Sequence, residues 1–215
     1  PATIELDEAR VYQWLKNGAQ PSDSVSQLFK AAGTLERYAR FKAGEAVETL
    51  AAAGHEVAVL LPRYRKTPAT GLVVSRLSLQ AAGSTRHPNI RDGGVINGVQ
   101  YFFVDDPEYF DRDQLYGTAQ GDYPDNAERF AEFSRAAIEV AAHVWVPDVV
   151  HCHDWQGGLV PVLLRTQHEE DPTLRKLPVV LTIHNVGYQG VFPRESMERA
   201  GLPDSLFSLN GLEFY

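Results

Sequence analysis

Two short segments carry the side chains best suited to chemistry. They are Asp148-Val-Val-His-Cys-His-Asp-Trp-Gln-Gly-Gly158 and Val179-Val-Leu-Thr-Ile-His-Asn-Val-Gly-Tyr-Gln-Gly190. Each begins with apolar residues typical of a buried strand and ends in imidazole, carboxylate and amide groups, which bind polar ligands and exchange protons. Because ligands of parallel α/β sheets gather beyond the carboxyl ends of the strands, we expect these two strand ends to share one crevice.

The run His151, His153 and Asp154 is also a possible set of metal ligands. Alternate residues of a strand face the same way, so the two imidazoles converge only if the strand continues through both. No further spaced cluster in the sequence completes a coordination shell. We therefore expect no metal and no other cofactor, and a metal-dependent enzyme remains a weaker alternative that bound zinc would support.

The surrounding sequence predicts an α/β fold that positions the two strand ends. Strands are predicted over 148–151 and 178–183, a helix over 157–168 separates them, and a shorter helix starts near Arg194. This βαβ alternation predicts parallel strands. The other predicted elements are helices over 8–17, from Ser22 and over 35–53, strands over 56–61 and 72–79, a hairpin at Asn97-Gly98, and a long amphipathic helix over 124–144.

Composition indicates a globular protein without a general nucleic-acid surface. The chain has 215 residues, 44% of them hydrophobic, and a formal net charge of −8. Residues 1–45 hold six acidic and six basic residues, so the remainder holds 22 acidic against 14 basic residues and supplies the whole negative balance. A single cysteine, Cys152, excludes an internal disulfide. With no leader or long apolar run either, we expect a cytoplasmic protein that does not enter membranes.

Several linked motifs closely resemble bacterial glycogen (starch) synthase in order and spacing. They cover about residues 47 to 215 and are Gly54-His-Glu-Val57 with Leu61-Pro-Arg-Tyr64, Tyr101-Phe-Phe-Val-Asp105, His151-Cys-His-Asp-Trp155, and Leu181-Thr-Ile-His-Asn185 with Tyr188-Gln-Gly190. The resemblance implies the Rossmann-like N-terminal domain of a GT-B glycosyltransferase, incomplete and truncated over residues 46–215. It also implies transfer of glucose from ADP-glucose to the nonreducing 4-hydroxyl of an α-1,4-glucan, with retention of configuration and without a metal.

The resemblance implies two catalytic residues. His184 matches the family's histidine beside the transferred glucose, and the alternative is a core-facing histidine at a strand end. Asp154 matches an aspartate close to sugar and acceptor, but it could instead cap the helix predicted to begin near Gly157. Asn185 matches the asparagine that follows the family's histidine.

Further residues are implied to bind substrate. Tyr123 and Asn126 match a Tyr-x-Asp-Asn loop on the acceptor side, and their alternative is an ordinary helix-start motif. Tyr188 and Gln189 match the end of the His-Asn loop, where they would shape the cleft wall. Gln156 stands where the family usually has histidine, and an amide can bind a sugar hydroxyl but cannot carry a proton.

The chain also departs from the family pattern. The family's Lys-x-Gly-Gly loop, which holds the donor phosphates, should begin near position 35, but the sequence there is Leu35-Glu-Arg-Tyr38. Lys42-Ala-Gly44 lies out of register, and the first strand is missing. The second domain, with the basic residues that hold the nucleotide, would lie beyond Tyr215. We therefore expect this chain alone to be inactive, with its nucleotide-binding domain missing.

Residues 1–45 resemble a different family, the C-terminal half of the sixteenth bacterial small-subunit ribosomal protein. The motifs are Ile4-Glu-Leu-Asp7, Tyr12-Gln-Trp-Leu15 and Gly18-Ala-Gln-Pro-Ser-Asp-Ser-Val25, with Gly33 after the second helix. This resemblance implies a small helical segment joined near Ala46, as in a fusion of two gene fragments. Contact with ribosomal RNA is an alternative function, and a solvated helical surface is the favoured interpretation because acids and bases are interspersed.

Overall fold

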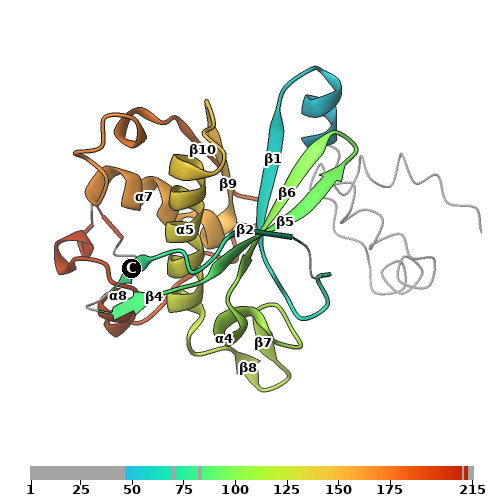
Figure 1. Ribbon diagram of the computed structural model, residues 1–215. Coiled ribbons are helices and arrows are strands. Elements are labelled where there is room, and N and C mark those ends of the chain that lie inside the picture. The colour runs from blue at the N-terminus through green and yellow to red at the C-terminus, as the bar shows by residue number, and fades with distance from the viewer. Residues whose placement is uncertain (1–46, 69–70, 82–83, 210, 213–215) are drawn as a thin grey trace, which may run out of the picture. The chain divides into compact units, whose positions relative to one another are not determined.

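The computed structural model describes residues 47–68, 71–81, 84–209 and 211–212 (Figure 1). The chain divides into two compact units, residues 1–57 with 96–99 and residues 58–95 with 100–215. The helices predicted over 8–17 and from Ser22, most of the helix over 35–53, and the junction near Ala46 lie outside the described residues.

In the first unit, the described residues confirm two local predictions. Residues 47–52 are helical, and Gly54 follows with a φ of 93°, a conformation that favours glycine at the end of a helix. Asn97 and Gly98 have φ values of 52° and 81°, as the tight turn predicted from an Asn-Gly pair requires. The Asn97 amide donates to Glu48 Oε1 at 2.8 Å.

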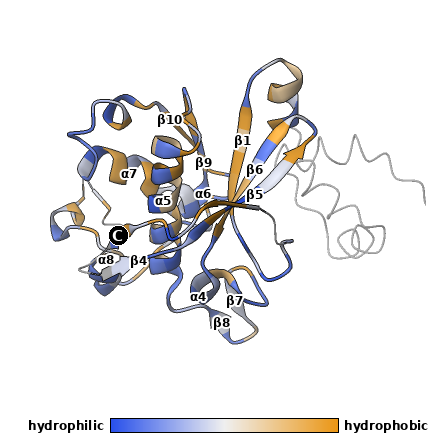
Figure 2. Ribbon diagram, viewed as in Figure 1, coloured by the Kyte–Doolittle hydropathy of each residue, from blue (hydrophilic) through white to orange (hydrophobic). Residues whose placement is uncertain are grey.

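The strands within the described residues form four sheets. The largest has the order β1-β6-β5-β2, in which β2 and β5 are antiparallel, and the smaller sheets are β9 with β10, β3 with β4, and β7 with β8. The strand bounds are β1 Val57–Pro62, β2 Gly71–Val74, β3 Leu79–Ala81, β4 Ser84–Arg86, β5 Asn89–Ile96, β6 Val99–Asp105, β7 Gly117–Thr118, β8 Gly121–Asp122, β9 Val150–His153 and β10 Val179–Thr182. β1 is coloured largely hydrophobic in Figure 2, although most of its residues are only partly buried and Leu61 is 43% exposed.

The helices are mostly short, with one exception. Their bounds are α4 Pro107–Phe110, α5 Asn126–His143, α6 Asp154–Gly157, α7 Leu159–Thr166 and α8 Glu195–Arg199, with 3₁₀ turns at η1 Leu174–Lys176 and η2 Asp204–Leu206. The long helix predicted over 124–144 is therefore confirmed as α5. None of the described helices combines the length and apolar composition needed to cross a membrane.

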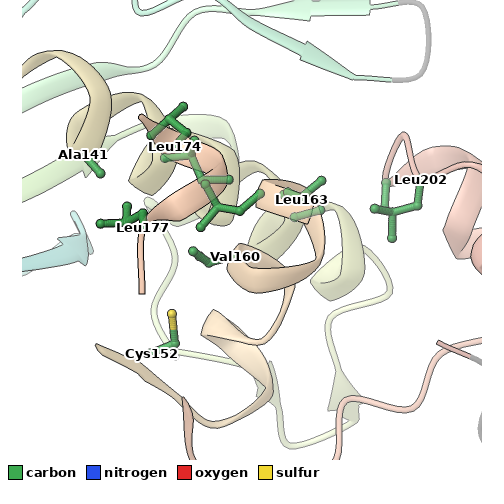
Figure 3. Packing of buried hydrophobic residues seen from close by; sticks show 11 residues of the cluster. Ala141, Cys152, Val160, Leu163, Leu174, Leu177 and Leu202 are labelled. Atoms are coloured by element: carbon green, nitrogen blue, oxygen red, sulfur yellow. The ribbon is translucent and has the colours of Figure 1, made fainter. Parts of the chain in front are cut away.

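Helix α5 lies between two hydrophobic clusters of the second unit. Ala136 and Val140 face the sheet residues Ile90, Phe102 and Val104. Ala131, Ile138 and Ala141 face the other way, into a cluster that includes Cys152, Val160, Leu163, Leu174, Leu177 and Leu202 (Figure 3). Because both faces are buried, α5 carries small residues as well as large ones, and it fixes β9 to the rest of the unit.

The predicted βαβ arrangement is confirmed, with shifted bounds. β9 and β10 run parallel, with Val150 beside Val179 and His153 beside Thr182. β9 begins at Val150 rather than at residue 148, because its first ladder bond runs from the Val150 amide to the Pro178 carbonyl at 2.9 Å. The strand therefore continues through His153.

Two predicted elements are each divided in the structure. The helix over 157–168 is two helices, α6 and α7, with Gly158 between them. Gly157 lies against the strand, since a Cβ there would come within 3.1 Å of Cys152 Cβ. The strand over 72–79 is interrupted at Arg76, whose φ of 55° breaks the extended backbone, and the Arg76 amide donates to Asn89 Oδ1 instead of to a neighbouring strand.

Candidate active site

Four side chains lie along one face of the β9–β10 pair and its extension. His151 and His153 face the same way, as expected for alternate residues of a strand that continues through both, and their ring centroids are 4.3 Å apart. His151 Nε2 lies 2.7 Å from Thr182 Oγ1. His153 Nδ1 lies 2.9 Å from His184 Nε2, with the ring centroids 5.2 Å apart and an interplanar angle of 15°, so the two rings meet edge to edge in nearly the same plane. The register of the two strands thus joins the two sequence motifs.

Asp154 connects the two motifs through the backbone. Its φ is 53°, a left-handed conformation that aspartate tolerates better than most residues, and it is the first residue of α6. Its Oδ1 accepts a hydrogen bond of 2.6 Å from the backbone amide of His184. Neither α6 nor α7 has a side-chain cap, so the alternative in which Asp154 caps the following helix is wrong.

The segment after β10 presents its side chains to solvent. His184 is exposed, which contradicts the alternative of a core-facing histidine. The Asn185 Oδ1 accepts from the Gly187 amide at 2.9 Å, which closes a tight turn. The Gln189 amide donates to the Val186 carbonyl at 2.9 Å, and Tyr188 is 73% exposed. Asn185 and Gln189 therefore shape this loop, while Tyr188 is free to contact a ligand.

Trp155 anchors that loop against the core. Gly190 has a φ of 65°, and a Cβ there would lie 2.8 Å from three atoms of the Trp155 side chain. The indole also packs edge-on against Phe130, with centroids 4.9 Å apart, and against Phe192 at 5.3 Å. Only glycine allows this close approach, so Gly190 and Trp155 together determine where the His184 loop lies.

Tyr116 lies beside the site, although no sequence motif singles it out. Its ring lies 6.4 Å from the Trp155 ring. The pKa of its hydroxyl is raised, first by burial and then by the negative charge of Asp154, and a hydrogen bond with the Gln156 side chain acts in the opposite direction. Gln156 therefore has a protein partner at the edge of the site, and its amide fits the predicted hydrogen-bonding role.

Tyr123 and Asn126 lie at the start of α5 and hold the Tyr116 segment. The Asn126 amide donates to the Tyr116 carbonyl at 2.8 Å, and its Oδ1 accepts from Arg129 at 2.6 Å. Asn126 is only 2% exposed. The Tyr123 ring is half-buried, with the Arg112 guanidinium 4.6 Å from its centroid. The structure thus gives Asn126 a helix-start role, and contact of either residue with an acceptor stays a prediction.

The electrostatics of the site favour a neutral His153 ring. The pKa of His153 is lowered, first because the ring is partly withdrawn from water and then because His151 and His184 lie close, while Asp154 acts in the opposite direction. Burial raises the pKa of the Cys152 thiol to about 11, so this cysteine is a packing residue and not a nucleophile at neutral pH.

Within the described ranges, no group of three or more histidine, cysteine, aspartate or glutamate side chains is arranged to hold a metal ion. His151 and His153 do converge, but each engages a neighbour across the strand pair instead. The arrangement can bind a polar ligand through an imidazole, a carboxylate and amides. It can also accept or donate a proton at His184.

Comparison with known proteins gives consistent results. The family model described as the starch synthase catalytic domain matches residues 43–215. The chain is similar to the glycogen synthase of Koribacter versatilis, with 52% identity over 176 residues that cover 80% of this chain and 36% of the relative. It is similar to glycogen synthase 2 of Geobacter metallireducens, with 36% identity over 200 residues that cover 91% of this chain and 40% of the relative.

A solved structure is similar as well. The catalytic domain of starch synthase IV from Arabidopsis thaliana, bound to ADP and acarbose, matches with a TM-score of 0.63 and 27% identity over 77% of this chain and 34% of that one. The likeness confirms a GT-B-like α/β fold with a mixed sheet. The chain thus spans little more than a third of the length of these proteins.

No comparison supports the ribosomal resemblance of residues 1–45. The family model begins at residue 43. The alignment with the Geobacter metallireducens protein leaves about a tenth of this chain uncovered, which is fewer than 45 residues, so it extends into that segment. Contact with ribosomal RNA therefore has no support beyond the motifs of the sequence.

Proposed function

The chain belongs to the family of starch synthase catalytic domains, and from this premise we propose that it forms one wall of a glucosyltransferase site. The proposed reaction transfers glucose from ADP-glucose to the nonreducing 4-hydroxyl of an α-1,4-glucan, with retention and without a metal. The observation that carries the proposal is the 2.6 Å bond between Asp154 Oδ1 and the His184 amide, which joins the two predicted catalytic residues across the neighbouring ends of β9 and β10.

Positioning is the proposed role of this wall. A transfer of this kind requires the anomeric carbon of the donor to be held against an acceptor hydroxyl. Asp154 follows β9 directly, and His184 and Asn185 come within three residues of the end of β10, so their backbone positions depend on the strands rather than on a long loop. Exposed Tyr188 and the Gln156 amide would line the same wall. The ADP in the Arabidopsis structure supports a nucleotide-sugar donor for this chain.

The proposed site residues supply no fixed positive charge. They are histidine, aspartate, asparagine, glutamine and tyrosine, whereas a leaving nucleotide diphosphate requires cationic groups or oriented amides. We propose that this charge comes from the part of a starch synthase that the chain does not span. The 215-residue chain alone should therefore show no glucose transfer.

A chimera tests the proposal directly. Residues 47–212 would replace the matching part of the Koribacter versatilis glycogen synthase, and incorporation of radiolabelled glucose from ADP-glucose into glycogen would be measured beside the chain alone. We expect activity from the chimera and none from the chain. His184→Ala in the chimera should lower kcat by at least about 100-fold, the scale found for removed transition-state contacts.

The matched control is His143→Ala, which removes another exposed imidazole in the last turn of α5. This variant should retain the activity of the chimera. A folded chimera with no activity would contradict the proposed function, and so would equal activities for the two histidine variants. Glucose transfer by the chain alone would contradict the proposal that the cationic groups come from the part of a starch synthase that this chain does not span.

A further inference from the structure

The hydrogen bond between His153 and His184 restricts the protonation of both rings. Because His153 Nδ1 and His184 Nε2 face each other at 2.9 Å, one nitrogen must carry the proton and the other must offer a lone pair. If both were protonated, two donors would face each other and the bond would be lost. The tautomers of the two rings are therefore linked, and the interplanar angle of 15° places the ring nitrogens nearly in one plane, as an in-plane N–H···N bond requires.

The surroundings indicate which ring donates. The groups facing the pair are His151 on β9, Thr182 on β10 and Asp154 on α6, and His151 Nε2 is engaged with Thr182 Oγ1. The pKa of His153 is lowered, first by partial burial and then by the nearby His151 and His184, so this ring favours its neutral form. A neutral ring with a lone pair at Nδ1 carries its proton at Nε2, the tautomer that imidazoles favour in water.

We propose that His153 is a positioning residue that accepts a hydrogen bond from His184 Nε2–H and so holds His184 in a single tautomer and ring plane. Nδ1 of His184 then carries a lone pair, and within the described part of the chain it has no hydrogen-bond partner. This nitrogen is the one available to accept a hydrogen bond from a sugar hydroxyl. That last role rests on the proposed function, whereas the tautomer itself does not.

Nuclear magnetic resonance of the nitrogen-15-labelled 215-residue chain tests the tautomer without substrate. The expected result is a His184 Nε2–H proton that exchanges slowly with water and a nitrogen–nitrogen coupling across the bond to His153 Nδ1. A His184 that exchanges freely and mixes tautomers as free imidazole does would overturn the proposal. So would a coupling whose proton resides on His153.

Three variants separate positioning from general structure. His153→Phe keeps an aromatic ring at this position but removes the acceptor, so the coupling and the slow exchange should be lost. His153→Asn places an amide oxygen near the Nδ1 position, so slow exchange and the single tautomer should return. His151→Phe, on the same strand face, should leave His184 unchanged because its partner is Thr182.

If His153→Phe does not fold, the wild-type coupling and the His153→Asn spectrum still decide the question. Loss of the tautomer in His153→Asn together with its retention in the wild type would show that packing of the aromatic ring, and not the hydrogen bond, positions His184, which overturns the proposal. Because no donor or acceptor sugar is present, these outcomes do not depend on whether the chimera transfers glucose.

Discussion

Two polar regions of the second unit hold their charges in opposite ways. In the region around Arg86, Asp106 is 7% exposed and Glu132 is 4% exposed, and both contact the guanidinium, with 2.7 Å between Arg86 Nη2 and Asp106 Oδ2. Beside it, Asp105 binds Arg63 at 3.0 Å. In this charged cluster every named carboxylate already has a cationic partner.

The strand-end site differs on each of these points. His151, His153 and His184 are exposed, and the carboxylate of Asp154 is bonded to a backbone amide rather than to a cation. The backbone of Asp154 is in the left-handed region, which carries a conformational strain that the named residues of the charged cluster do not have. Buried charges that pair with one another link the elements that carry them. Exposed polar side chains on a constrained backbone remain available to bind a ligand.

The largest expected effect is on the charged cluster. Arg86→Met would leave Asp106 and Glu132 buried beside each other without a cation, so we expect a loss of about 3–5 kcal/mol in the free energy of unfolding. Urea denaturation measures it. The matched control is Arg65→Met, because Arg65 pairs with the exposed Asp111 and Asp113 and its removal should change stability little. Equal effects for the two variants would contradict a structural role for the cluster.

Glu132 should make stability depend on pH. Burial, and after it the neighbouring Asp106, raise the pKa of Glu132 to about 8 against an ordinary value of 4.5, although Arg86 opposes the shift. The folded state then binds this proton more tightly than the unfolded state, so its stabilising effect is complete below pH 4.5 and is lost as the pH rises to about 8.

Glu132→Gln sharpens this prediction, since the amide cannot ionise. The free energy of unfolding of the wild type should fall relative to that of Glu132→Gln as the pH rises from 5 to 8, by an amount on the order of a few kcal/mol. Urea titrations of both proteins at each pH measure the difference, in which the effects of the histidines cancel. Parallel curves for the two proteins would show that Glu132 is ionised throughout.

A smaller effect is expected at the loop of the strand-end site. Gly190→Ala would place a Cβ 2.8 Å from Trp155 and force a non-glycine residue to a φ of 65°, so we expect a cost of about 1–3 kcal/mol and a shifted Trp155 indole resonance. Gly187→Ala is the control in the same loop, because its Cβ would meet only the Asn185 side chain, at 3.2 Å. An unchanged indole resonance in Gly190→Ala would mean that Trp155 does not anchor the loop.

The two regions also differ in what the sequence could predict. The turn at Asn97-Gly98, helix α5 and the two strand ends were predictable because each depends on neighbouring residues or a short period. The Arg86 cluster was missed because its members come from a strand, a loop and a helix, and no local pattern links them. The pairing of His153 with His184 was missed for a related reason, since it depends on the register between two strands. Tyr116 reaches the site only through the packing of its segment on α5.

The smallest effect concerns the charge of Asp154 alone. Asp154→Asn keeps an Oδ1 acceptor for the His184 amide, and asparagine tolerates a φ of 53° as well as aspartate does. The free energy of unfolding near neutral pH should therefore change by less than about 0.5 kcal/mol. The charge of Asp154 raises the pKa of His153, so its removal should lower that pKa further.

The direction of the His153 pKa shift also affects how stability depends on pH. Because the folded pKa of His153 lies below its ordinary value of 6.5, the unfolded state binds this proton more tightly, and stability falls as the pH drops below 6.5. Asp154→Asn should steepen that fall slightly. Titration of the His153 ring resonances in Asp154→Asn, with Asp148→Asn as the control just before β9, measures the shift. A higher His153 pKa in Asp154→Asn, or an equal shift in the control, would mean that the Asp154 carboxylate does not act on the imidazole pair. The contrast with the charged cluster, where carboxylates act directly on their cationic partners, would then be larger.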